Sequence, residues 1–101
     1  MAFSAEQSTA DPSVVVVTGE LDVATVGDLR EVGLKALAAA GPDLVVEASG
    51  LEFTDSTGLG CLVSLHKRAT DAGGTLVLRG ANDRLRRLLE MVSLTSVFRV
   101  E

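Results

Sequence analysis

The sequence lacks several residue types on which disulfides, metal sites and catalytic sites depend. It has no Trp, no Tyr, a single cysteine, Cys61, and a single histidine, His66. One cysteine cannot form an intramolecular disulfide, and with one histidine it leaves only scattered carboxylates for a metal ion, so we expect no disulfide and no metal site. No apolar run reaches the ~18 residues of a membrane span, and the N-terminus has no secretory signal pattern. We therefore expect a cytoplasmic protein with no membrane partner.

Positive charge is also scarce. The chain has nine Lys and Arg against 14 Asp and Glu, which gives a formal net charge of -5. Nucleic acid and anionic membranes attract clustered Lys and Arg, so we expect no nucleic-acid partner. The basic cluster of Arg84, Arg86 and Arg87 lies in a helical pattern beside Asp83 and Glu90. We interpret it as a solvated helix face rather than a phosphate-binding patch.

The length of the chain and its aliphatic composition favour one small domain. A chain of 101 residues suits a single core, and we expect one domain over residues 1–101. Hydrophobic residues make up 47% of the sequence but aromatic residues only 3%, so that core must consist mainly of Val, Leu and Ala. Residues 1–12 are polar and predict at most a weak edge strand, over residues 2–6, or a flexible N-terminus.

Apolar stretches of strand length recur along the chain. Four consecutive valines at 14–17 begin a stretch that runs to Leu21, and these β-branched residues predict a strand buried on both faces. A turn is expected before it, at residues 11–13, and a connection at residues 50–53. The expected strands cover residues 14–21, 43–49, 75–80 and 97–101.

Between the strands the apolar residues follow helical spacing. The first helix is expected within residues 22–41, with Thr25 or Asp22 as its cap and Gly41 followed by Pro42 at its end. The second is expected over residues 56–71 and the third over residues 82–92, with Asn82 as a cap. The apolar stripe of the second helix is predicted to contain Leu59, Leu62, Val63, His66 and Ala69. This alternation predicts an α/β fold with a mixed, mostly parallel sheet of four to five strands flanked by helices.

The segment "TDSTGLG" at residues 54–60 places hydroxyl groups in a turn from strand to helix. A nucleophile elbow requires G-x-S-x-G, but Thr54 occupies the first glycine position. His66 follows Ser56 by ten residues, roughly 15 Å along the same helix, so it cannot act as the base. "GLG" lacks the third glycine of a dinucleotide loop and the Lys of a P-loop. We therefore expect neither an enzyme nor a cofactor.

A structural role explains part of this segment. Asp55 or Ser56 would cap the second helix, and Gly58 and Gly60 would let its first turn pack closely on the sheet. One cap does not account for Asp55, Ser56 and Thr57 in succession. Since a helix N-terminus has free N–H groups and a partial positive charge, a phosphate on a first-turn hydroxyl would be tolerated there. The segment therefore suits a covalent charge switch.

Polar residues after the first strong strand are expected beside this segment. Gly19, Glu20 and Asp22 fall at the carboxyl end of that strand, the edge of a parallel sheet at which sites assemble. They form either a turn with a helix cap or part of a partner-binding surface, and we favour the surface. Cys61 and His66 are interpreted as packing residues, and Met91 as a core or gap-filling residue.

Three stretches of the sequence resemble a known family. They are "GELD" at 19–22, "LVVEASGLEFTDSTGLGCLVSLHKRATDAGGTLVLRG" at 44–80 and "RLLEMVSLTSVFRV" at 87–100. Together they resemble the STAS domain of bacterial anti-sigma factor antagonists, and the Asp-Ser-(Ser/Thr)-Gly-Leu-Gly core is the specific part. The sequence departs from the family at Ser93, where Gly is frequent in the last helix-to-strand turn, and at Glu47, where Asp or Asn is common.

The resemblance implies a function in sigma-factor control. An unphosphorylated antagonist of this family binds an anti-sigma serine kinase loaded with ATP or ADP and displaces its sigma factor. The kinase inactivates the antagonist by phosphorylating the first hydroxyl after the Asp, here Ser56, with Thr57 as the less favoured acceptor, and a serine phosphatase reactivates it. The alternative is a STAS-domain scaffold or regulatory subunit of a multi-protein sensor or transport complex, without phosphorylation. The expected partner-binding residues are Gly19, Glu20, Asp22, Asp55, Ser56, Thr57 and Gly58.

Overall fold

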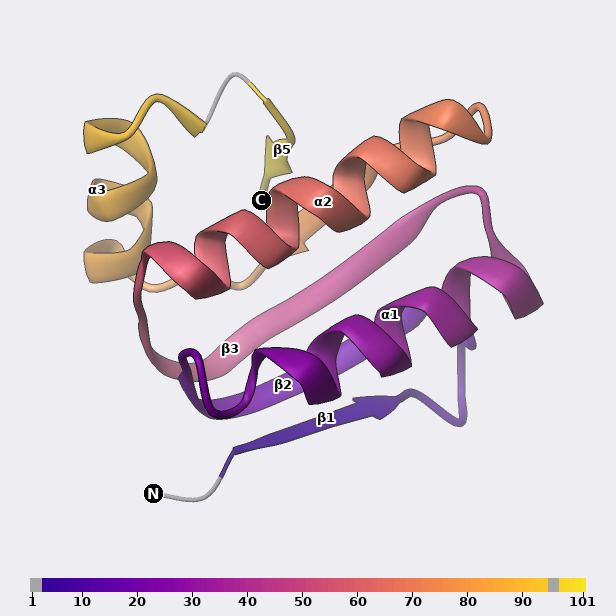
Figure 1. The fold of residues 1–101 in the computed structure, drawn as a ribbon, viewed down its shortest axis with the longest axis horizontal. Helices are drawn as coiled ribbons and strands as arrows, with labels where there is room; N and C mark the ends of the chain where they lie inside the picture. Colours follow the sequence, from indigo (N-terminus) through magenta and orange to yellow (C-terminus); the bar gives the residue numbers. More distant parts are fainter. Residues whose placement is uncertain (1–2, 95–96) are drawn as a thin grey trace.

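The structure is a computed structural model that describes residues 3–94 and 97–101 (Figure 1). Its strands form one sheet in the order β1-β2-β3-β4-β5, in which β1 is antiparallel to β2 and the other neighbours are parallel. The expected α/β fold with a mixed, mostly parallel sheet is thereby confirmed. The strands are β1 (Ser4–Gln7), β2 (Val14–Leu21), β3 (Leu44–Thr54), β4 (Leu76–Arg79) and β5 (Arg99–Val100), and the helices are α1 (Val26–Ala40), α2 (Ser56–Asp71) and α3 (Asp83–Met91).

One face of the sheet carries the main core. Helices α1 and α2 lie side by side across this face, whereas α3 lies beyond the end of β4 (Figure 1). The core is aliphatic, as the composition predicted, because Val, Leu and Ala supply all of its buried members except Cys61 and Phe98. Among its fully buried side chains are Val15, Val17, Leu29, Leu44, Val46, Leu62, Leu65, Leu76 and Leu78.

The prediction that β2 is buried on both faces is wrong. Val15 and Val17 have no exposed surface, but Val16 between them is 37% exposed. Successive side chains of a strand point to opposite faces, and α1 and α2 cover only one of them. On the uncovered face Thr18 and Ser4 share a hydrogen bond of 2.7 Å between their hydroxyl oxygens.

The central strand is longer than the sequence suggested. Residues 50–53 were expected to be a connection, but β3 continues through them to Thr54. They are held by β2, since Glu20 pairs with Phe53 and Leu21 with Thr54 after a shift of register at Gly19. Gly19 has a φ of 88°, a conformation that glycine adopts without strain. As a result β3 leads directly into α2, with one residue between them.

The buried faces of the helices differ in detail from the predicted stripes. Leu65 of α2 is buried although its position lay outside the predicted stripe. It packs against Gly33 of α1, where an added Cβ would lie 2.8 Å from Leu65 Cδ1, so glycine permits the close approach of the two helices. The predicted members Leu59, Leu62 and Ala69 are buried, whereas Val63 and His66 are half-buried.

The other residues interpreted as packing residues divide into two groups. His66 Nδ1 accepts a hydrogen bond from the Leu76 backbone N–H at 3.2 Å, and its ring meets Phe98 edge-on at 5.9 Å. Burial raises the pKa of the Cys61 thiol, which keeps it protonated, so both residues have the predicted structural role. Met91 does not, because its side chain is 78% exposed at the end of α3.

The turn after α3 contains a strained residue, and this gives the first testable prediction. Ser93 has a φ of 61°, in the left-handed region that disfavours side chains other than Gly and Asn. We expect Ser93→Gly to stabilise the fold by about 0.5–1 kcal/mol, because glycine relieves the strain but loses more entropy on folding. Urea denaturation measures the change, with Ser93→Ala as the control that keeps the strain. A loss of stability in Ser93→Gly would show that interactions of the serine outweigh the strain.

Candidate functional site

Asp55 forms the start of α2. Its backbone is extended, with φ −108° and ψ −173°, and its Oδ1 accepts a hydrogen bond from the Gly58 N–H at 3.0 Å. Its carbonyl oxygen accepts from the Leu59 N–H at 3.0 Å, which begins the helical ladder. Of the two expected caps, the structure therefore selects Asp55 and leaves Ser56 at the first helical position.

Ser56 and Thr57 occupy the first turn of α2 and are both exposed. In the described part of the chain, neither hydroxyl has a hydrogen-bond partner, and neither backbone N–H meets an acceptor. The first turn of a helix carries a partial positive charge on such free N–H groups. The site thus presents two accessible hydroxyls over a backbone that favours a negative charge.

The turn after β2 lies directly beside this helix start. The Asp55 N–H donates to the Leu21 carbonyl at 3.2 Å, because the parallel strands β2 and β3 end together. The Thr25 hydroxyl donates to the Glu20 carbonyl at 2.9 Å and accepts from the Asp22 N–H at 3.0 Å. Thr25 is the N-cap residue by position, but its side chain makes no cap hydrogen bond to α1. Thr25, one of the two expected caps, therefore stabilises the loop between β2 and α1 and does not cap the helix with its side chain.

The structure gathers the predicted site residues at one edge of the sheet. Glu20, Ser56 and Thr57 are exposed there, and Asp22 and Asp55 are half-buried. Three of the five carry carboxyl groups, so a phosphate would add charge to an edge that is already acidic. The buried residues Gly19 and Gly58 belong to the backbone beneath this surface. Within residues 3–94 and 97–101 no group of three potential ligands could hold a metal ion.

The two glycines of the motif have different environments. A Cβ on Gly58 would collide with the Thr54 hydroxyl oxygen and lie 2.8 Å from Leu21 Cγ, so this position requires glycine. At Gly60 the equivalent point has no atom within 4 Å apart from those of adjacent residues and of the helix backbone. The expectation of close packing is therefore right for Gly58 and wrong for Gly60.

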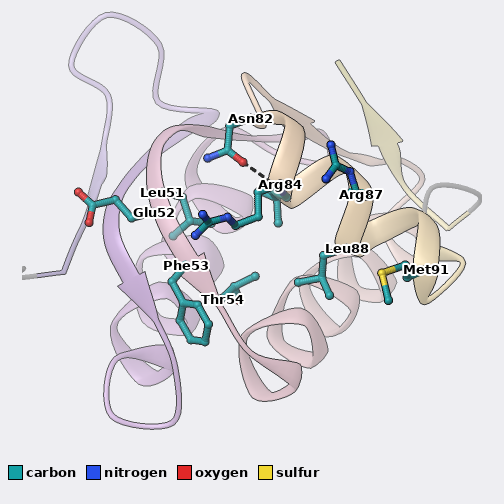
Figure 2. A pocket seen from close by; sticks show the side chains of 10 residues that line it. Leu51, Glu52, Phe53, Thr54, Asn82, Arg84, Arg87, Leu88 and Met91 are labelled. Carbon is teal, nitrogen blue, oxygen red and sulfur yellow. Dashed lines mark hydrogen bonds between the residues drawn. The ribbon is translucent and has the colours of Figure 1, made fainter.

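Sequence reasoning missed a groove between the end of β3 and α3, here called the β3–α3 groove. It has a volume of about 330 Å³ and shares Thr54 with the turn into α2 (Figure 2). Phe53 on its wall is 49% exposed, an unusual position for the side chain of a central strand. The extended alternation of Leu51 and Phe53 was the available signal. The groove is lined by Leu51, Glu52, Phe53, Thr54, Asn82, Arg84, Leu85, Arg87, Leu88 and Met91.

Glu47 lies away from this edge of the sheet. Its carboxylate forms an ion pair with the Arg79 guanidinium at 2.6 Å, and this partner holds the pKa of Glu47 below its usual value. Seven residue steps of strand lead from Glu47 to Thr54, about 23 Å at the usual rise. The departure from the family at Glu47 thus leaves the geometry of the α2 start unchanged.

Comparisons with known proteins agree with this architecture. The sequence matches the family described as "Mlab, STAS domain" over residues 4–99. It is 37% identical over 83 residues to the anti-sigma-B factor antagonist of Bacillus subtilis (strain 168), a match covering 82% of this chain and 75% of that protein. It is 35% identical over 101 residues to the anti-sigma-B factor antagonist of Staphylococcus aureus (strain NCTC 8325), covering 99% of this chain and 94% of the relative.

Solved structures share the fold. The anti-sigma factor antagonist SpoIIAA in its unphosphorylated form superposes with a TM-score of 0.74 at 22% identity, over 99% of this chain and 88% of that one. The Bacillus SpoIIAA structure in the phosphorylated form gives a TM-score of 0.68 at 23% identity, over 99% and 91%. In the described ranges, none of the helices has both the length and the apolar content to cross a membrane. The family match over residues 4–99 shows that this chain belongs to the STAS domain family.

Proposed function

We propose that the chain acts in the cytoplasm as an anti-sigma factor antagonist controlled by phosphorylation of Ser56. In this proposal the unphosphorylated form binds an anti-sigma serine kinase carrying ATP or ADP and frees the sigma factor. The kinase then phosphorylates Ser56 and ends the interaction, and a serine phosphatase restores the hydroxyl. The observation that carries the proposal is the exposed Ser56 hydroxyl, which has no hydrogen-bond partner among the described residues and lies at the first position of α2.

The chemistry of phosphoryl transfer fits this position. The Ser56 oxygen would attack the γ-phosphorus of ATP, the bond to the β-phosphate oxygen would break, and the hydroxyl proton would pass to a base of the kinase. The chain itself needs only to present an accessible oxygen. The free N–H groups of Ser56 and Thr57 favour the added negative charge. A related fold, SpoIIAA, exists in a phosphorylated form, which supports the view that the fold tolerates a phosphate.

Mass spectrometry of the intact protein tests the phosphorylation step. Incubation with ATP and the anti-sigma kinases of the source genome should add one phosphate to the wild type and to Thr57→Ala, but none to Ser56→Ala. Phosphate found on Thr57 alone would show that Thr57, and not Ser56, is the acceptor. If kinases that are shown to phosphorylate their own antagonists add no mass to this chain, the result favours the scaffold alternative.

Charge reversal beside the acceptor tests the partner surface. Glu20 is exposed and has no side-chain hydrogen bond among the described residues, so Glu20→Lys should leave the melting temperature nearly unchanged. We expect it to weaken kinase binding by about 10-fold, as when a charged contact in an interface is reversed. Asp71→Lys, the same charge change at the far end of α2, is the control and should bind like the wild type. Equal kinase affinities of Glu20→Lys and Asp71→Lys would show that Glu20 is not part of the partner-binding surface.

A further inference from the structure

The β3–α3 groove has an apolar interior. Leu51 and Leu85 form its buried part, being only 3% and 6% exposed. Phe53 comes from the end of β3, and Leu88 and Met91 come from successive turns of α3 (Figure 2). Phe53 and Met91 remain exposed, 49% and 78%, in the described structure. The groove thus offers an aliphatic ligand a surface that the fold itself leaves partly uncovered.

The polar groups at the groove are mainly hydrogen-bond donors. Arg84 and Arg87 form no ion pair or hydrogen bond with any described residue, and Figure 2 shows Arg84 reaching from α3 toward β3. Asn82 uses its Oδ1 to cap α3, accepting from the Leu85 N–H at 2.8 Å, so its amide N–H groups are available. Glu52 turns its carboxylate away from these donors (Figure 2). The Arg84 guanidinium and the Asn82 amide, which lie on the same side of the groove in Figure 2, are complementary to an anion.

Arg86 is not part of this arrangement. Its guanidinium Nε donates to the Ala81 carbonyl at 3.2 Å, and the residue is half-buried. The basic cluster of the sequence is therefore divided: one arginine secures the start of α3, while Arg84 and Arg87 line the groove. The interpretation of all three as one solvated helix face does not account for this division.

The size of the groove limits the ligand. Its volume of about 330 Å³ is at the lower end of the range for small-molecule sites, about 300–1,000 Å³. Octanoate, with a short aliphatic tail and one carboxylate, is a ligand suited to the lower end of this range.

We propose that the β3–α3 groove binds a free medium-chain carboxylate. The tail lies against the apolar wall, and the carboxylate accepts hydrogen bonds from Arg84 and the Asn82 amide. The proposal does not require phosphorylation of Ser56, and its test uses the unmodified chain, so it stands or falls separately from the phosphorylation switch.

Titration of the 15N-labelled full chain with sodium octanoate tests the proposal by NMR. We expect saturable amide shifts concentrated at the end of β3 and in α3. 1-Octanol, which keeps the tail but loses the charge, should bind with an affinity at least about 10-fold lower than that of octanoate. Acetate, which lacks the tail, should not bind. Equal affinity for octanol and octanoate, shifts centred on another surface, or no shifts at millimolar octanoate would overturn the proposal.

Two variants locate the ligand. Arg84→Gln removes one exposed donor and should weaken octanoate binding about 10-fold, while Arg68→Gln, the same substitution on α2, should have no effect. Leu88→Gln places a polar group in the wall and should weaken octanoate and octanol alike, with a melting curve to verify that it folds. Unchanged affinity in both Arg84→Gln and folded Leu88→Gln would show that octanoate binds elsewhere.

Discussion

Phosphorylation of Ser56 is expected to lower the affinity for the anti-sigma kinase by at least ~100-fold without unfolding the protein. The phosphate adds roughly −1.5 to −2 charges at an edge that already carries Glu20, Asp22 and Asp55. Within the free protein the open N–H groups at the start of α2 and the surrounding water stabilise that charge. In an interface shaped around a hydroxyl the same charge would lose its water and meet no counter-charge. The penalty therefore falls on binding and not on folding.

Calorimetric titration of nucleotide-loaded kinase with each form measures this effect. Ser56→Ala should bind like the unmodified protein, because a methyl group fills a site shaped for a small side chain. Ser56→Asp should lose less affinity than the phosphorylated form, since it adds one charge and fewer acceptor oxygens. Circular dichroism should be the same for all of them. Equal affinities would exclude electrostatic repulsion, and unfolding on phosphorylation would mean that the switch works through stability.

Gly58→Ala is expected to destabilise the fold by about 2–3 kcal/mol, a large fraction of the stability of a small domain. Its new Cβ would collide with the Thr54 hydroxyl oxygen and lie within 3 Å of Leu21 Cγ. Both neighbours are buried, at 6% and 0% exposure, and the contact with Leu21 includes its branch point, Cγ, as well as Cδ2 at 2.9 Å. Relief would require the start of α2 to move away from β2 and β3.

Gly60→Ala is the matched control for this effect. Gly60 lies on the same helix two residues later, is exposed, and leaves the space for a Cβ empty. Alanine favours helix over glycine, so this variant should gain about 0.5–1 kcal/mol. Urea denaturation of both variants gives the comparison. Similar stability changes in the two would contradict the close packing at Gly58.

The sequence was sufficient for the order of the elements and for the edge of the sheet at which residues 19–22 and the start of α2 meet. The alternation of apolar stretches with helical spacing predicted the parallel sheet, and parallel strands must end at a common edge. That rule correctly predicted that residues 19–22 would lie beside Asp55, where the Leu21 carbonyl now accepts its N–H. The alternative caps, Asp55 and Ser56, could not be separated because both residue types accept from the first turn.

What could not be predicted depends on contacts between distant segments. Val16 looks like its neighbours in the sequence, and only the position of the helices shows that its face is uncovered. Gly58 and Gly60 are chemically identical, and the side chains of Thr54 and Leu21 distinguish them. The β3–α3 groove required the extension of β3 past Gly50 and the place of α3 in the fold, neither of which local spacing encodes.

Release of a sigma factor tests the central claim most directly. A fluorescently labelled sigma factor bound to its anti-sigma kinase has high anisotropy, and displacement lowers it. The unmodified chain, added to this complex with ADP so that no phosphate can be transferred, should lower the anisotropy to that of free sigma factor. The chain phosphorylated on Ser56 should leave it unchanged at the same concentration. Release by both forms would contradict the switch at Ser56, and release by neither, from the kinase that phosphorylates this chain, would contradict its action as an antagonist.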